Sequence, residues 1–518
     1  MKSIALLLLA SAFTHGFAQN ISAQDATTFA LTYGYPLLAY EKIRIQVNAT
    51  GVNKWLHFRD FQTPSNKFVV KPNVDTLYSS MVYDLSHDDL LVSIPEGIPD
   101  SQFHLISFFD PFGTNYVNLG SLNTNTPGTY RLQPRTTEPT PQISSGNDTV
   151  VATIKTSSIY GFLLIRWLVN NTNIDQVHDW QDRTINATEA ALARAPALAS
   201  LPVISSSRTP ADNVLNLLTA FERYTLPDST ELAQNVTATL AIAGIGNGTY
   251  TSPNVNITQA NQTAVATAAS AAAAPSARTT LDNNWTVANS SLIGIYDDNY
   301  AFRTAVASGG YLAIRSPNAI YPGLSIGDSA ALGGDFTLGP NDAIVLTFSG
   351  KPPLTDTGFW SLTAYQDNYL IANQYNTYAI TSERSNFTYA DGTRVYGTSL
   401  NQTFQVLIQP ADIAPPSNWS NNFLPGPPGG GRMALTLRIY DAQQSLLDGQ
   451  WSYPAVSKQA AIGNGTNASN TTTAPSSSPT STTNATAGTA TYTGDGLTWT
   501  VPGTLLSAAV LLTVVWYL

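Results

Sequence analysis

The sequence predicts a mainly β protein with a helical insert, and three observations carry this prediction. Short apolar runs recur over residues 51–172 between Pro, Gly and Asn turns, which is the rhythm of a β-sandwich or jelly roll. The period becomes helical over residues 173–308, and the strand rhythm returns over residues 309–460. We therefore expect two jelly-roll-like β-sandwich domains separated by helices.

Composition bounds the functions that this chain can have. Its 518 residues can bury several cores, but only 11% are charged, so Ser, Thr, Asn, Gln and attached sugars must supply much of the solubility. The net charge of -10 argues against a nucleic-acid partner. Because Cys is absent, disulfides, zinc–thiolate sites and cysteine nucleophiles are excluded.

The N-terminal residues are typical of a secretory signal. A basic start is followed by the apolar run 4–12 and by the small residues Gly16 and Ala18, so residues 1–18 are expected to be removed. The next segment, residues 19–50, is helical in period, with a face made of Phe29, Tyr33, Leu37, Tyr40, Arg44 and Val47.

The C-terminal residues predict a lipid anchor. Residues 461–494 are rich in Ser, Thr, Asn, Gly and Ala and cannot form a core, so they are expected to be an O-glycosylated stalk. Small residues at 494–496, a spacer and an apolar tail follow, as in a GPI signal with attachment at Gly494 and a propeptide over 495–518. A single transmembrane helix is the alternative, but the apolar run 505–518 is shorter than the roughly 20 residues such a helix needs.

Acceptor sequons for N-glycosylation are frequent along the chain. On a secreted protein each occupied sequon marks a solvent-exposed position. The sites that we expect to be glycosylated are Asn48, Asn147, Asn235, Asn247, Asn256, Asn284, Asn386 and Asn401.

The first β domain is organised around residues 68–85, where an apolar strand, a polar kink and a second strand follow one another. Pro72 cannot donate to a strand ladder and pushes Lys71 toward extended geometry, so the kink belongs at a sheet edge. Asn73 and Asp75 share one face of the second strand. A buried Asp needs a cation or backbone donors, so Asp75 is either a structural staple or part of a site.

Two groups of motifs carry a family resemblance. Residues 71–79 (KPNVDTLYS) and 110–115 (DPFGTN) resemble domain-of-unknown-function family 1254. Residues 359–365 (FWSLTAY) and 435–440 (LTLRIY) are similar to its usual C-terminal companion, family 1214. The resemblance implies a double jelly roll in a secreted, GPI-anchored member, and it implies no reaction. That family usually has Arg before the Tyr that follows its FWSLT strand, whereas Thr377 stands there in this chain.

Three acids are the candidate catalytic residues, namely Asp75, Asp84 and Asp110. A pair of carboxylates can hydrolyse a glycosidic bond when their separation is right. The structural alternative is that the acids satisfy buried donors and turns, since Asp110 before Pro111 is ordinary turn chemistry.

Arg166 leads the candidate binding residues. Leu164 and Leu168 flank it on its own strand face, so we expect a buried guanidinium that pairs with one of the three acids. It is then either a salt-bridged core staple or a site for a ligand carboxylate. Asn73, Tyr78 and Trp360 complete the set, with Trp360 expected as an exposed ring on which a sugar can stack.

No metal or cofactor is expected, because the few histidines are not spaced for chelation. Two functions stay open. The first is a GPI-anchored surface glycoprotein of the plasma membrane with a binding or cell-wall structural role, its partners being the membrane surface and a wall glycan. The alternative is an extracellular hydrolase of wall glycan or a small ester that uses Asp75, Asp84 and Asp110. The sequence indicates no oligomeric state.

Overall fold

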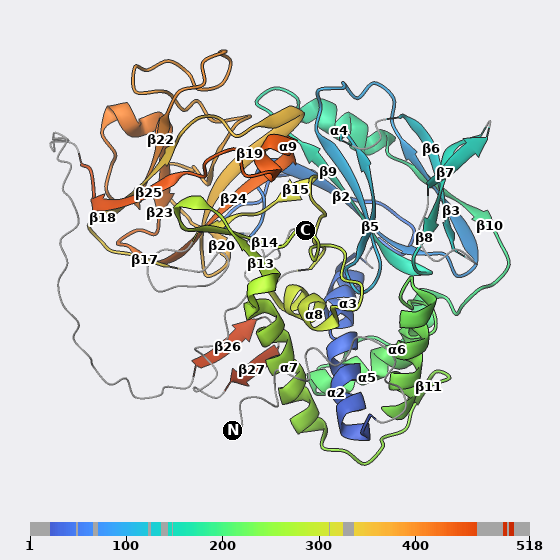
Figure 1. The fold of residues 1–518 in the computed structure, drawn as a ribbon. Helices are drawn as coiled ribbons and strands as arrows, with labels where there is room; N and C mark the ends of the chain where they lie inside the picture. Colours follow the sequence, from blue (N-terminus) through green and yellow to red (C-terminus); the bar gives the residue numbers. More distant parts are fainter. Residues whose placement is uncertain are drawn as a thin grey trace, which may run out of the picture.

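A computed structural model gives a mixed α/β, strand-rich fold with several antiparallel sheets (Figure 1). It describes residues 21–47, 50–65, 71–122, 126–135, 143–147, 149–309, 311–324, 336–463, 490–494 and 497–501. The expected signal peptide, Asn48 and the apolar tail lie outside the described residues. In the described part, no helix is long and apolar enough to cross a membrane.

The first β domain consists of two five-stranded sheets packed face to face. The first sheet has the order β1-β2-β9-β4-β5 and the second β10-β3-β6-β8-β7. Apolar residues of both sheets, such as Leu77, Trp167 and Leu90, form the core between them. The strands are β1 (Leu56–Phe58), β2 (Thr76–Asp84), β3 (Asp88–Ile94), β4 (His104–Phe109), β5 (Asn115–Gly120), β6 (Gly128–Pro134), β7 (Ile143–Asn147), β8 (Val150–Thr156), β9 (Tyr160–Leu168) and β10 (Asn186–Ala190).

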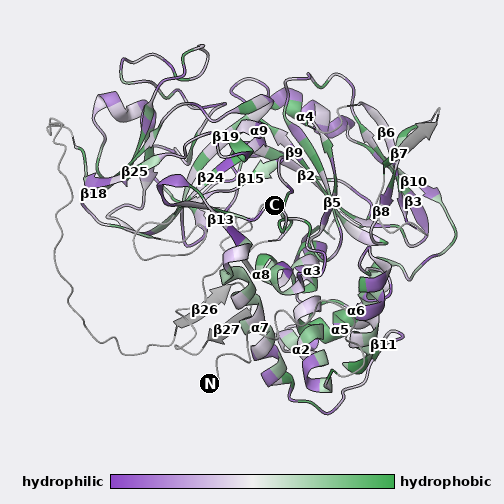
Figure 2. Cartoon of the chain, viewed as in Figure 1, coloured by the Kyte–Doolittle hydropathy of each residue, from purple (hydrophilic) through white to green (hydrophobic). Residues whose placement is uncertain are grey.

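A helical layer covers part of the other face of the first sheet (Figure 1). Its helices carry both hydrophobic and hydrophilic residues, as expected of helices with one buried face (Figure 2). They are α2 (Ala23–Gly34), α3 (Pro36–Val47), α5 (Pro210–Phe221), α6 (Thr230–Ile242), α7 (Ile257–Ala273) and α8 (Tyr300–Gly309), while α4 (Ile174–Arg183) packs on the first β domain.

Residues at the ends and contact points of these helices explain where they begin and how they pack. Thr209 accepts a hydrogen bond from the backbone of Asp212 and caps α5, with Pro210 in its first turn. The segment after the expected signal is helical, with Pro36 as the first residue of α3. Gly34 allows α2 and α5 to approach closely, because a Cβ there would lie 2.6 Å from Leu218.

The second β domain has a large sheet ordered β13-β14-β16-β24-β19-β20, to which β15, β17 and β21 add, and a four-stranded sheet ordered β23-β22-β18-β25. Its strands are β13 (Arg278–Thr280), β14 (Trp285–Ala288), β15 (Ala319–Ile320), β16 (Gly323–Leu324), β17 (Phe336–Leu338), β18 (Asp342–Phe348), β19 (Leu354–Gln366), β20 (Tyr369–Leu370), β21 (Ala379–Thr381), β22 (Phe404–Pro410), β23 (Phe423–Gly426), β24 (Gly431–Ala442) and β25 (Ala455–Ala460). Five strands, β10, β11 (Ile245–Gly246), β12 (Thr249–Tyr250), β13 and β14, lie in the stretch that the sequence assigns to the helical insert.

Farther along, β26 (Ala490–Gly494) and β27 (Leu497–Val501) form a separate hairpin, in which Gly494 is the last residue of β26. Short helices at Leu198–Ser200, Pro275–Ala277, Asp282–Asn284, Ser417–Asn422 and Gln444–Leu447 (α9) complete the described elements, together with the strand pair β11 (Ile245–Gly246) and β12 (Thr249–Tyr250).

Strand β24 shows how the two β domains meet. Met433, Leu435, Leu437 and Ile439 alternate along this strand and belong to the core of the second domain. The opposite face is not solvent-exposed, since Arg438 and Tyr440 are both 0% exposed. Phe103 of the first domain packs there, with ring centroids 5.0 Å from Phe359 and 5.4 Å from Tyr440. The outer faces of two sheets therefore pack against each other.

The segment Lys71–Asp75 is held at this junction. The backbone N–H of Lys71 donates to the Asn368 carbonyl at 2.7 Å, and its own carbonyl accepts from Arg438 at 3.1 Å. Lys71 has a φ of 48°, so the expectation of extended geometry before Pro72 is wrong. Contacts with the second domain impose this left-handed conformation on a residue that would avoid it in isolation.

Asp441 joins the two domains and carries a buried charge. Its carboxylate accepts hydrogen bonds from Ser121 of the first domain and from Thr357, each at 2.9 Å. Burial raises the pKa of Asp441 to about 6, although these hydrogen bonds lower it. An acid with a raised folded-state pKa contributes stability below its unfolded pKa and loses that contribution as the pH rises through the folded value.

We therefore predict that Asp441→Asn becomes more stable relative to the wild type as the pH rises from about 4 to 7, by about 2–3 kcal/mol. Asn tolerates the φ of 49° at this position. Urea unfolding across this pH range measures the difference. Asp391→Asn is the control and should show little pH trend over this range. Hydrogen bonds with Thr393 lower the pKa of that exposed acid, so its contribution changes only below about pH 4. If the difference in unfolding free energy between Asp441→Asn and the wild type does not change with pH, the raised pKa of Asp441 is contradicted.

Candidate functional site

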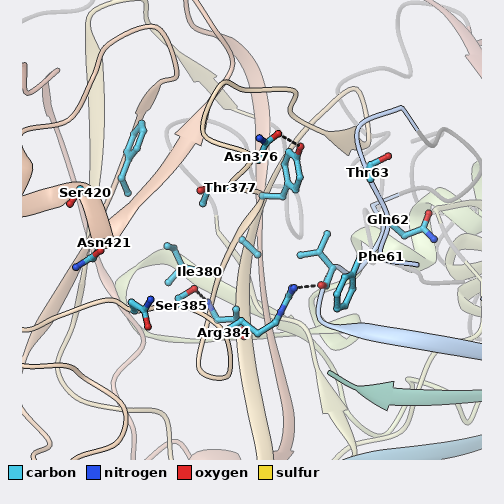
Figure 3. A pocket seen from close by; sticks show the side chains of 16 residues that line it. Phe61, Gln62, Thr63, Asn376, Thr377, Ile380, Arg384, Ser385, Ser420 and Asn421 are labelled. Atoms are coloured by element: carbon cyan, nitrogen blue, oxygen red, sulfur yellow. Dashed lines mark hydrogen bonds between the residues drawn. The ribbon is translucent and has the colours of Figure 1, made fainter. Parts of the chain in front are cut away.

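A cavity of about 430 Å³ lies where the two β domains meet (Figure 3). Phe61, Gln62, Thr63 and Val74 of the first domain line one side of it. The second domain supplies the other side from two segments, which contribute Asn376, Thr377, Tyr378, Ala379, Ile380, Thr381, Arg384, Ser385, Asn386, Ser420, Asn421 and Phe423.

The lining combines amides and hydroxyls with aromatic rings. Tyr378 donates a hydrogen bond to the Asn376 side chain at 3.2 Å, which orients both groups at the cavity (Figure 3). The Oε1 atom of Gln62 is buried and accepts no hydrogen bond from the described residues. Buried polar atoms are normally satisfied, so this oxygen is free to accept from a ligand.

Arg384 is the single cation among the described residues that line the cavity, and Asp75 stands behind it. The guanidinium lies 3.1 Å from Oδ1 of Asp75, which is 0% exposed. It also donates to the Val74 carbonyl and covers the Phe61 ring at 4.4 Å from the centroid. Burial and the charge of Asp75 raise the pKa of the neighbouring Glu383, against a hydrogen bond from Ser382.

Asp75 is thus paired, but not with the predicted cation. Arg166 is 1% exposed, and no carboxylate of the described chain lies within 4.0 Å of its nitrogens. Its guanidinium donates a long hydrogen bond of 3.5 Å to Ser107 Oγ. The prediction that Arg166 pairs with one of the three acids is wrong, because Arg166 lies within β9 opposite Tyr78 whereas the acids lie at strand ends.

Nor does Asp75 lie close to Asp84, the acid at the other end of β2. Asp75 precedes β2 and Asp84 ends it, so nine residues of extended chain place them roughly 30 Å apart. Catalytic carboxylate pairs of glycosidases lie within about 5–9.5 Å of each other.

Backbone N–H groups bind the carboxylates of the other two acids, Asp84 and Asp110. The Asp84 carboxylate accepts from the backbone N–H groups of Ser86 at 2.8 Å and Leu198 at 2.7 Å. Asp110 accepts from those of Phe112 and Thr114, both at 2.9 Å, as the turn interpretation predicts. Burial raises the pKa of Asp110, although the nearby Arg303 and these hydrogen bonds lower it.

The remaining candidate binding residues are buried. Asn73 donates to the Tyr440 hydroxyl at 3.1 Å and accepts from the Asp75 backbone at 2.6 Å, so it connects the domains. Tyr78 is 1% exposed, and burial raises the pKa of its phenol. Trp360 is 0% exposed and donates to Tyr396 at 2.6 Å, so the expectation of an exposed sugar platform is wrong. It belongs to the inner face of β19.

Most of the expected glycosylation sites that the structure describes are at the surface. Asn247, Asn256, Asn284, Asn386 and Asn401 are exposed, and Asn235 is half-buried. The side chain of Asn147 is outside the described part. Among the described residues, no group of three His, Asp or Glu side chains is placed to hold a metal ion.

Comparison with known proteins places two domains in the chain. Residues 52–187 match the family model for a protein of unknown function (DUF1254), and residues 333–444 match that for a protein of unknown function (DUF1214). Both lie where the motifs indicated. No curated protein matches the chain.

Two solved structures are similar to this chain. The VPA0106 protein from Vibrio parahaemolyticus is 15% identical with a TM-score of 0.55, over 85% of this chain and 100% of that protein. A protein from Burkholderia cenocepacia, described as uncharacterised, is 10% identical with a TM-score of 0.40, over 83% of this chain and 88% of that one. At this level of identity, the first similarity shows a shared fold alone.

The Arg384–Asp75 pair generates a testable asymmetry. Arg384→Leu should destabilise the protein by about 2–4 kcal/mol, because it leaves a carboxylate buried without its cation. Asp75→Asn should cost about 1 kcal/mol, because the Arg384 side chain is 24% exposed and can still reach water. Urea unfolding of both variants and of the double variant measures the coupling. If the two single variants lose equal stability, and if these losses add in the double variant, then the ion pair does not stabilise the protein as proposed.

Proposed function

We propose that this chain, with its DUF1254 and DUF1214 domains, is a GPI-anchored surface glycoprotein that binds a wall-type saccharide in the cavity between those domains. The observation that carries the proposal is the lining of the cavity. Amides and hydroxyls lie beside Phe61, Tyr378 and Phe423, and a volume of about 430 Å³ is suited to a ligand of one or two sugar rings. Aromatic faces and oriented amides are the groups that recognise sugars.

The charge of the cavity favours a neutral ligand. Arg384 is neutralised by Asp75 at 3.1 Å and is already stacked on Phe61, so it offers little to an additional anion. Its guanidinium retains donors that can meet a ligand hydroxyl. A polyhydroxylated ligand uses this mixture of donors and acceptors fully.

The surface location rests on the sequence features at both ends and on the exposed sequons. A signal-like start, a Ser/Thr-rich stretch and an apolar tail are the features of an anchored surface protein. Asn386 is exposed and lines the cavity, so a glycan attached there would stand at the cavity entrance. Binding is therefore best measured before and after enzymatic deglycosylation.

The hydrolase alternative receives no support from the geometry, because Asp75 lies roughly 30 Å from Asp84 along β2. The carboxylates of Asp84 and Asp110 are already engaged by backbone N–H groups. The finer description of the body as a double jelly roll is also part of this proposal. It is supported by the two pairs of packed sheets and by the family motifs.

A saccharide array followed by calorimetry tests the function. We expect wall oligosaccharides to bind the deglycosylated protein, and the double variant Gln62→Ala/Asn421→Ala to bind about thirtyfold more weakly, since each lost hydrogen bond is worth about 1 kcal/mol. Lys54→Ala, in a separate hollow of about 690 Å³, is the matched control and should bind normally. Absence of saccharide binding, or equal losses in the cavity variant and the control, would refute the proposal.

A further inference from the structure

A second polar site is buried on the outer face of the first sheet, away from the cavity lining. Arg166 and Tyr78 are direct cross-strand partners there. Ser80 and Ser107 occupy the next row on the same face, on either side of Leu164. None of these four side chains is more than 1% exposed.

These polar groups have too few partners for such deep burial. By distance and angle, Nε of Arg166, the Tyr78 hydroxyl and the Ser80 hydroxyl make no hydrogen bond with the described residues. The Thr76 side chain is the polar neighbour of the Tyr78 hydroxyl and lowers its pKa. The nearest acceptor recorded for the guanidinium is Ser107 Oγ at 3.5 Å, which is a weak contact. Burying an ion without a counter-ion costs several kcal/mol, so the fold retains this cation against a substantial penalty.

The surroundings increase the positive potential. Burial and the nearby Tyr440 raise the pKa of Tyr78, whereas the charges of Arg166 and Arg438 lower it, so two guanidinium groups act on one phenol. Tyr321 packs against both the helical core and the cluster around Tyr440. The charges of Arg166 and Arg438 act on its phenol as well and lower its pKa against burial. Asp75, one of the three acids expected to pair with Arg166, is engaged with Arg384.

We propose that Arg166, Tyr78 and Ser80 form a binding site for a small monovalent anion, either a halide or a carboxylate of formate size. The unbonded groups are a guanidinium N–H and two hydroxyls, all of which can donate to an anion. A bound anion would neutralise Arg166 and satisfy these donors together. The site is independent of the saccharide proposal, because none of its residues lines the cavity.

Thermal unfolding at constant ionic strength tests the site. We expect the Tm of the full protein to rise with chloride, bromide or formate and to reach a plateau, compared with gluconate, which is too large to enter. The halide and formate series distinguish the two kinds of anion. A Tm that is the same in all these salts would overturn the proposal.

Variants assign the effect to these residues. Tyr78→Phe keeps the ring and should weaken anion binding about tenfold, and Arg166→Gln should abolish the anion dependence of the Tm. Tyr389→Phe is the control, because that hydroxyl donates to the Leu400 carbonyl at 2.7 Å in another core. If Arg166→Gln does not fold, anomalous diffraction from bromide-soaked crystals of the wild type tests the site instead. Anomalous density beside Arg166 supports the site, and its absence there overturns it.

Discussion

The packing of two outer sheet faces against each other is the constraint on which the rest of this structure depends. Strands β2, β9 and β4 form one face, and β19 and β24 form the other. Phe103 packs edge-on against Phe359 and Tyr440, whose rings stack on each other. The segment Lys71–Asp75 runs through the junction, where the Tyr365 hydroxyl donates to the Pro72 carbonyl at 2.7 Å. Because each contact joins residues about 300 positions apart, neither domain could form this surface alone.

Both proposed sites follow from that packing. On one side of the Lys71–Asp75 segment, Arg384 lines an open cavity between the two domains and pairs with the buried Asp75 behind it. On the other side, the same packing removes Arg166 from water without supplying a carboxylate. The ion pair makes the cavity nearly neutral, whereas the unpaired guanidinium makes the buried face positive. The two sites are therefore suited to different ligands, one to a neutral saccharide and the other to a small anion.

Sequence reasoning succeeded where the signal was local and failed where it depended on register between distant strands. The helical period of residues 19–50 and the turn at Asp110 could be predicted, because both depend on neighbouring residues. That a buried Asp75 needs a cation or backbone donors could also be predicted, but the choice of Arg384 could not, since the two are 309 positions apart. The burial of Trp360 was missed because FWSLTAY has apolar residues on both faces, and only the packed sheet shows which face is inside.

Native-state hydrogen exchange measures most directly whether the two domains depend on each other. If the facing sheets form one cooperative unit, backbone amides of β9 and β24 should exchange with the same opening free energy and respond equally to urea. Amides of β24 that open at a distinctly lower free energy than those of β9 would show that the domains unfold independently. The junction would then not be the constraint that organises the molecule.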